Sequence, residues 1–218
     1  MSRAQPTTDA ATAAREEILQ AAAELFTDLG YALTSIDAIA ERLGATKGRV
    51  YYYFKSKADI FFDIQRAAMA RLMAEVEPIA RSTLGPADKL RGMAEAHLGM
   101  LLADLPIQKV SVQGLERYLF HSSGYRYVNE LREINQLRDT YEQIFAEVID
   151  QGAREGVFSD MPPRLLTKPF FGALNWVTVW YRPRKLQDAQ SNRMIVETLV
   201  SFAMQGIQKE PDHEPKSG

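Results

Sequence analysis

The chain has 218 residues, of which 46% are hydrophobic and 25% charged, so it can build a sizeable core and disorder throughout is excluded. The 26 Lys and Arg against 28 Asp and Glu give a net charge of −2, which excludes a uniformly basic nucleic-acid binder. The chain contains no cysteine, which excludes disulfides, thiolate metal sites and cysteine nucleophiles.

Apolar residues recur at helical spacing nearly everywhere, and no convincing strand-length alternation occurs, so the predicted fold class is all-α. The first helix is expected from about residue 12 to 29, where the apolar residues form one stripe and Gly30 follows. Thr34 with Asp37 has the spacing of a capping box, which predicts the start of a second helix that ends at Gly44.

Thr46 can cap a third, short helix whose apolar anchors are Val50 and Phe54. A fourth, long helix is expected to open at about residue 57. A compact three-helix domain is therefore predicted for residues 1–56.

Five more helices are expected in a larger C-terminal domain, residues 57–208, which brings the total to about nine. They span about residues 86–104, 107–122, 131–152, 162–181 and 188–207. Residues 209–218 are polar and proline-containing and are expected to form a disordered tail.

The segment from residue 42 to 58 carries five cations and no acidic residue. They are Arg42, Lys47, Arg49, Lys55 and Lys57. Two short helices joined at Gly44, the second one basic, have the form of a helix-turn-helix, whose second helix enters the major groove of DNA. The alternative, that the charges are merely solvated, is disfavoured by their number and by the turn.

Residues 15–65 resemble the DNA-binding domain of the TetR family of bacterial repressors. The resemblance lies in "AAAELFTDLGYALTSIDAIAERLGATKGRVYYYFKSKADIF" and covers about a quarter of the chain. It implies a cytoplasmic homodimer whose N-terminal domains bind a pseudo-palindromic operator in double-stranded DNA. It also implies a helical C-terminal domain that binds a small-molecule inducer, which lowers the affinity for DNA.

Carried over by position, the resemblance implies eight DNA-contacting residues. They are Thr34, Thr46, Lys47, Arg49, Tyr51, Tyr52, Tyr53 and Lys57. Tyr53 stands where relatives often have histidine; it can donate one hydrogen bond to a phosphate but cannot gain a charge.

The C-terminal stretch "WVTVWYRP" is similar to a TetR subgroup that responds to acyl-CoA thioesters and controls fatty-acid catabolism. The ligand-binding candidates are large aromatic or polar side chains: Arg117, Tyr118, His121, Asn175, Trp176 and Trp180. Core packing explains the aromatic residues equally well, and an uncharged aromatic or drug-like inducer is the competing hypothesis.

The helices expected at 162–181 and 188–207 are apolar on more than one side, which predicts that a second copy of the chain covers them. The candidate interface residues are Phe170, Leu174, Tyr181, Ile195, Leu199 and Phe202. The alternative is that both helices are central core helices of a monomer.

No catalytic, metal or cofactor site is expected, because the three histidines lack metal-ligand spacing and no nucleophile elbow or phosphate-binding loop occurs. No apolar stretch approaches the roughly 18 residues of a membrane span, and the first residues lack a signal-peptide core, so no membrane partner is expected. The alternative from another class is a helical module whose basic segment binds an acidic protein.

Overall fold

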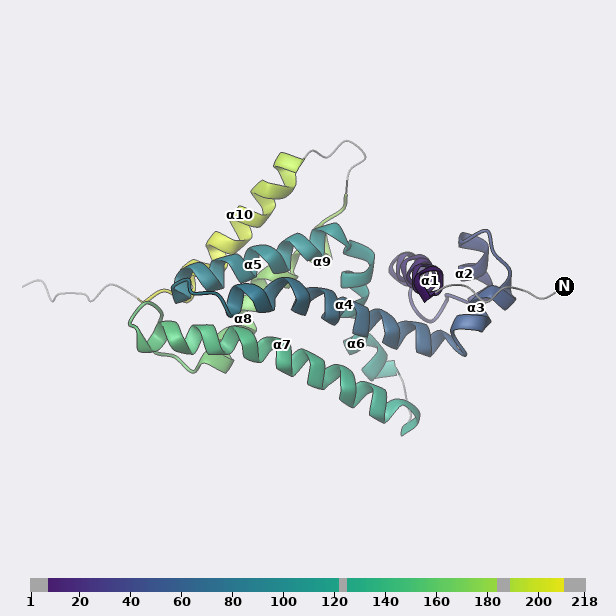
Figure 1. The fold of residues 1–218 in the computed structure, drawn as a ribbon, viewed down its shortest axis with the longest axis horizontal. Coiled ribbons are helices and arrows are strands. Elements are labelled where there is room, and N and C mark those ends of the chain that lie inside the picture. The colour runs from purple at the N-terminus through teal and green to yellow at the C-terminus, as the bar shows by residue number, and fades with distance from the viewer. Residues whose placement is uncertain (1–7, 122–124, 184–188, 210–218) are drawn as a thin grey trace, which may run out of the picture. The chain divides into compact units, whose positions relative to one another are not determined.

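The computed structural model describes residues 8–121, 125–183 and 189–209, and for residues 8, 9, 115–121, 125 and 189 it describes the backbone alone. The predicted all-α class is confirmed: these residues form α-helices, one 3₁₀ turn and an isolated bridge (Figure 1). The helices are α1 (Thr8–Asp28), α2 (Ile36–Arg42), α3 (Lys47–Tyr53), α4 (Lys57–Ala80), α5 (Pro86–Ala103), α6 (Leu105–His121), α7 (Val128–Arg154), α8 (Pro163–Asn175), α9 (Val177–Trp180) and α10 (Ala189–Gln205), with the 3₁₀ turn η1 (Tyr125–Tyr127) before α7.

The described part holds one α-helix more than the nine expected, because the helix predicted at 162–181 divides into α8 and α9 at Trp176. Trp176 keeps right-handed helical angles, φ −57° and ψ −24°, so α9 continues α8 after a single turn residue. Extended backbone at Tyr181 then ends α9, two residues before Pro183. The expected tail lies outside the described residues from residue 210 onward.

Two compact units make up the chain. One contains Met1–Ala70 and Asp104–Leu137, and the other contains Arg71–Ala103 and Arg138–Gly218. The continuous helices α4 and α7 each pass from one unit to the other. The domain boundary expected near residue 56 stays a prediction.

In the N-terminal unit, α1 packs against α2 and α6, and α2 packs against α3. Gly30 and Gly44 both adopt positive φ, 84° and 60°, which glycine tolerates and other residues rarely adopt. They let the chain turn sharply after α1 and between α2 and α3. An aromatic cluster fills the centre of this unit: Phe26, Tyr31, Phe61, Phe62 and Tyr127.

Ser35, not Thr34, caps α2, so the expected capping box is wrong by one residue. The Ser35 hydroxyl accepts a hydrogen bond from the Ala38 amide at 3.1 Å. Thr34 is only 2% exposed, and its hydroxyl donates to the Leu25 and Gly30 carbonyls. Thr34 therefore ties the end of α1 to the turn that follows it.

In the C-terminal unit, α10 packs against α5 and α8, and α5 also contacts α8. Gly152 on α7 allows the Phe158 ring to approach closely, because a Cβ at residue 152 would lie 2.1 Å from that ring. Phe158 is buried as a result. No helix in the described ranges is long and apolar enough to cross a membrane.

Candidate nucleic-acid interface and the C-terminal helix pair

Helix α3 turns its apolar side inward and its polar side toward solvent. Thr46 caps it, since its hydroxyl accepts from the Arg49 amide at 3.4 Å, and Val50 and Phe54 are buried. Lys47 and Arg49 are exposed, as are Tyr51 and Tyr52, the latter by 68%. Tyr53 is half-buried and packs edge-on against Tyr52. The structure thus groups five of the residues predicted to contact DNA on one short helix and a sixth, Thr46, at its N-cap.

Arg15 on α1 holds the C-terminal end of α3 and was missed by the sequence analysis. Its guanidinium lies 4.5 Å from the centre of the Phe54 ring and donates to the Tyr53 carbonyl at 3.4 Å. It also pairs with Asp63 on α4. One arginine therefore links three helices, but nothing in its sequence spacing distinguishes it from other helix-surface cations.

Lys57, predicted to grip a phosphate, is bound within its own chain. Its Nζ donates to the carbonyls of Tyr31 at 2.6 Å and Thr34 at 2.7 Å, and also contacts the Ala32 carbonyl. It lies 4.4 Å from the centre of the Tyr31 ring. Partial burial lowers the pKa of Lys57. Lys57 stabilises the turn between α1 and α2 through these contacts.

Three of the five cations in the basic segment pair with carboxylates on α1 and α2. Arg42 lies 2.9 Å from Glu24. Lys47 lies 2.9 Å from Asp37, and this hydrogen bond raises the pKa of the lysine. Arg49 lies 2.7 Å from Glu17 on α1.

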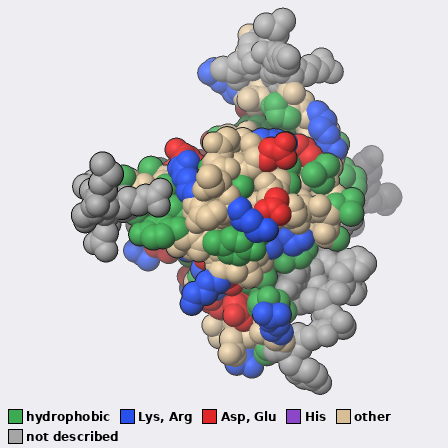
Figure 2. Space-filling model, turned by 90° about the vertical axis from the view of Figure 1, so that its right-hand side faces the viewer, with side chains coloured by type: hydrophobic (Ala, Val, Ile, Leu, Met, Phe, Trp, Pro, Cys, Tyr) green, Lys and Arg blue, Asp and Glu red, His purple; other side chains and the backbone are tan. Residues whose placement is uncertain are grey.

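The basic segment is therefore not a uniformly positive surface. Figure 2 views the molecule from the side on which α2 and α3 lie in Figure 1, and there Lys and Arg side chains stand beside Asp and Glu. A charge count along the chain misses this pairing, because the carboxylates come from other helices.

The predicted ligand residues do not gather in one described cavity. Arg117, Tyr118 and His121 lie in the part of α6 whose side chains are outside the described residues. Trp176 and Trp180 are 61% and 46% exposed.

Asn175 is half-buried and instead forms a hydrogen-bonded chain with two buried residues, Tyr141 and a histidine that the sequence analysis did not place in a site. The His97 ring on α5 bridges two partners: Nδ1 is 2.9 Å from the Tyr141 hydroxyl, and Nε2 is 3.0 Å from Asn175 Oδ1. A neutral ring satisfies both contacts, with Nε2 donating and Nδ1 accepting. Burial lowers the pKa of His97 to about 4, although the Asn175 bond opposes this shift. The rings of Tyr141, Phe145 and Phe171 surround the imidazole.

The predicted dimer residues fall into two groups. Phe170, Leu174 and Tyr181 are buried within their own chain, so their side chains are core and are not available to a partner. On α10, Ile195 and Leu199 are half-buried, and Phe202 is 68% exposed.

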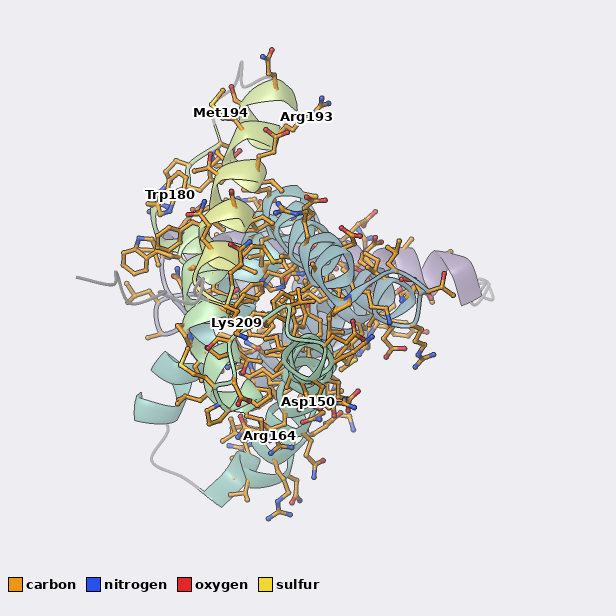
Figure 3. The ribbon with its side chains drawn as sticks, turned by 90° about the vertical axis from the view of Figure 1, so that its left-hand side faces the viewer. Asp150, Arg164, Trp180, Arg193, Met194 and Lys209 are labelled. Carbon is orange, nitrogen blue, oxygen red and sulfur yellow. The ribbon has the colours of Figure 1, made fainter. Side chains whose placement is uncertain are left out.

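A mostly apolar groove lies where α9 and α10 meet. It measures about 380 Å³ and is lined by Trp180, Ser191, Met194, Ile195, Thr198 and Leu199. Figure 3 shows Met194 on α10 and Trp180 beside that helix. The structure thus brings one predicted ligand residue together with two predicted interface residues.

Comparison with known proteins gives matches over both units. Residues 18–64 match the family model "Bacterial regulatory proteins, tetR family", and residues 83–207 match "Tetracyclin repressor-like, C-terminal domain". The transcriptional repressor KstR2 of Mycobacterium tuberculosis is 26% identical over 90% of this chain and 94% of its own length.

Two further proteins are similar along most of their length. The fatty acid metabolism regulator protein of Bacillus subtilis is 26% identical over 85% of this chain and 93% of its own length. The structure of AibR in complex with isovaleryl coenzyme A and operator DNA has a TM-score of 0.71 at 20% identity, covering 87% of this chain and 97% of AibR.

The C-terminal model alone spans more than half of the chain, and the helix-turn-helix geometry of α2 and α3 agrees with the N-terminal one. The chain belongs to the TetR family of bacterial transcriptional regulators.

Proposed function

We propose that this TetR-family regulator is a homodimeric repressor, which binds a pseudo-palindromic operator through α3 and releases it when a small-molecule inducer binds. The observation that carries the proposal is the orientation of α3. Val50 and Phe54 are buried and anchor the helix in the core. Lys47, Arg49 and Tyr52 lie on its exposed side. This is the arrangement that places side chains against base edges in a major groove.

The proposed contacts follow from what each side chain already does in its own chain. Lys47, Arg49 and Tyr52 are directed at bases or nearby phosphates, and Tyr51 and Tyr53 at phosphates. Three other predicted residues use their side chains to hold the backbone: Thr46 caps α3, while Thr34 and Lys57 hold the turn before α2. Their part in binding is to position α3, with at most secondary contact to DNA.

The proposed dimer face is the exposed side of α9 and α10. Phe202, Met194 and Trp176 are each at least 60% exposed, and the groove beside Trp180 adds further apolar surface. Large aromatic and aliphatic side chains this exposed are typical of a surface that another chain covers. A twofold pairing of this face gives a dimer with two α3 helices, one for each half-site of a pseudo-palindromic operator.

An acyl-CoA thioester is the proposed inducer. Two comparisons support this class of ligand: a relative named for fatty acid metabolism regulation, and the structure of AibR in complex with isovaleryl coenzyme A and operator DNA. Because that complex contains ligand and DNA together, it supports the binding of a CoA thioester and not the release of DNA. Because α4 runs through both units, a ligand in the C-terminal unit has a continuous element through which to act. Linkage then requires that operator DNA weaken inducer binding by the same factor.

The DNA-binding proposal is tested by selecting the preferred duplex from a random library and titrating it with Arg49→Ala and Tyr52→Ala. Each variant is expected to lose about 1 to 3 kcal/mol on the selected duplex and less on random duplex, because base contacts discriminate. Arg81→Ala, which removes an exposed arginine at the end of α4, is the control and is expected to change neither. Equal losses on both duplexes reduce Arg49 and Tyr52 to phosphate contacts. Wild-type protein that binds no duplex but binds acidic proteins is a helical protein-binding module instead.

The inducer is tested by calorimetry with acyl-CoA thioesters of graded chain length, followed by operator titration at saturating ligand. A coupling of about 1 to 3 kcal/mol lowers operator affinity roughly 5- to 150-fold. If an uncharged aromatic compound releases DNA while no thioester binds more tightly than roughly 100 μM, or about −5.5 kcal/mol, the acyl-CoA proposal fails and the repressor proposal stands.

A further inference from the structure

The two basic side chains of α3 meet carboxylates that remain open to solvent. Arg49 Nη2 lies 2.7 Å from Glu17 Oε2, and Lys47 Nζ lies 2.9 Å from Asp37 Oδ1. The Glu17 side chain is 57% exposed and the Asp37 side chain is 65% exposed. Both carboxylates therefore share the surface on which α3 presents its contact residues.

DNA would form charge-assisted hydrogen bonds with the same two cations, Lys47 and Arg49. A guanidinium that pairs with the O6 and N7 atoms of a guanine uses two of its five N–H donors, so a base contact made through Nη2 competes with the bond that Nη2 now forms with Glu17. A phosphate likewise competes with Asp37 for the Lys47 ammonium group. Once released, each carboxylate lies close to the phosphate backbone and is repelled by it.

We propose that Glu17 and Asp37 are intramolecular competitors of DNA. Each holds a cation of α3 that the duplex must capture, so the two carboxylates lower the affinity for DNA and hold down binding to random sequence. This inference rests on the proposed function, in which α3 is the helix that binds DNA.

A third ion pair of the same kind provides the comparison. Arg42 on α2 lies 2.9 Å from Glu24 on α1. The Arg42 side chain is 42% exposed, as Arg49 is, and Glu24 is 38% exposed, less than the carboxylates of the two α3 pairs. Arg42 is not among the predicted DNA contacts. Glu24→Gln therefore removes one negative charge from the same helix that carries Glu17 without freeing a cation of α3. It weakens the pairing of Arg42 with α1, of which the 3.9 Å contact with Asp28 remains.

The experiment measures the affinity of the full-length protein for a random duplex of about three helical turns, roughly 30 base pairs, and for the best duplex selected from a random library. The variants are Glu17→Gln, Asp37→Asn and Glu24→Gln. Glu17→Gln and Asp37→Asn are each expected to raise affinity for both duplexes about two- to fivefold per protomer, the range of an exposed ion pair. The gain is expected to shrink as salt rises, because the competing pair is screened. Glu24→Gln is expected to stay within twofold of wild type.

A double-mutant cycle distinguishes competition from simple repulsion. If Glu17 acts by holding Arg49, the gain from Glu17→Gln disappears in the Arg49→Gln background. A gain that persists there overturns the competition mechanism. Circular dichroism of each variant checks that the exposed substitutions leave the helices intact.

Two other outcomes overturn the inference. A loss of operator affinity in Glu17→Gln makes Glu17 a positioning residue that aims Arg49 at its base. A gain in Glu17→Gln no larger than in Glu24→Gln removes any special effect of the α3 pairs. Failure of the wild-type protein to bind any duplex is a separate result, because it refutes the proposed function itself.

Discussion

The surfaces of α3 and of α9 and α10 are both exposed, but they leave different chemistry in water. On α3, Lys47 and Arg49 are already paired with carboxylates of their own chain. On α9 and α10, Trp180 and Phe202 are apolar and remain 46% and 68% exposed. Binding at α3 therefore exchanges one ion pair for another and is sensitive to salt, whereas binding at the C-terminal helices removes apolar area from water.

Phe202→Glu is expected to have the largest effect, because it places a charge on the apolar face of α10. Burying a phenylalanine is worth about 1.5 to 3 kcal/mol, so losing two per dimer costs about 3 to 6 kcal/mol before the cost of burying the carboxylates. The dimer dissociation constant is expected to rise at least 100-fold, and operator binding to weaken with it. Sedimentation equilibrium measures the first effect and duplex titration the second.

Leu29→Glu is the matched control for that experiment. Leu29 is 50% exposed, but it follows α1 in the other compact unit, so its substitution is expected to leave the dimer intact. A stable, operator-binding dimer of Phe202→Glu would place the interface on another surface.

A smaller effect is expected on the pH dependence of the free energy of unfolding. It comes from His97, which is buried in the C-terminal unit, whereas the ion pairs around α3 are exposed. The folded-state pKa of His97 is about 4, below the ordinary 6.5, so the unfolded chain binds the extra proton between these values. Stability from this group is complete above pH 6.5 and is lost as the pH falls toward 4. Between pH 7 and pH 5 the free energy of unfolding is expected to drop by about 2 kcal/mol.

Urea unfolding of the wild type and of His97→Gln at both pH values measures this contribution. The variant is expected to be less stable at pH 7 but to lose less stability on acidification. A pH dependence identical to that of the wild type would assign the acid sensitivity to other groups.

The smallest effect is expected from replacing either of two exposed helical glycines, Gly48 and Gly99, with alanine. A Cβ at Gly48 on α3 would meet only the Thr46 hydroxyl, at 3.9 Å, and one at Gly99 on α5 would meet nothing within 4 Å. Replacing either with alanine is expected to raise the free energy of unfolding by up to about 1 kcal/mol, since alanine favours helix. Gly48→Ala alone is expected to weaken duplex binding, severalfold, because the added methyl group stands where DNA approaches α3.

Thermal unfolding of the two variants measures the change in stability, and duplex titration measures the change in affinity for DNA. Weaker duplex binding in Gly99→Ala as well would show that the loss comes from stiffened helices and not from contact with DNA. Unchanged duplex binding in Gly48→Ala would place the DNA backbone away from residue 48.

Local signals predicted most of the helices, because apolar spacing and glycine stops act over a few residues. The expected starts and ends of the helix at 86–104 lie within one residue of α5, and Gly30 and Gly44 do adopt the positive φ of helix ends. The cap of α2 was misplaced by one residue. Thr34 and Ser35 have similar capping chemistry, and burial against α1 decided which hydroxyl was left for the cap.

Residue types and their spacing were enough to predict the all-α class, the helix-turn-helix and the family, because each depends on a pattern along one chain. Which candidate side chains are available to a partner depends instead on how the helices pack. Phe170 and Leu174 share the apolar pattern of Phe202, yet they are buried in their own chain while Phe202 faces solvent. Arg49 is one of five cations in its segment, and its carboxylate partner is 32 residues away in the sequence. Burial and ion pairing depend on distances in space between helices, which the spacing of residues along a chain does not contain.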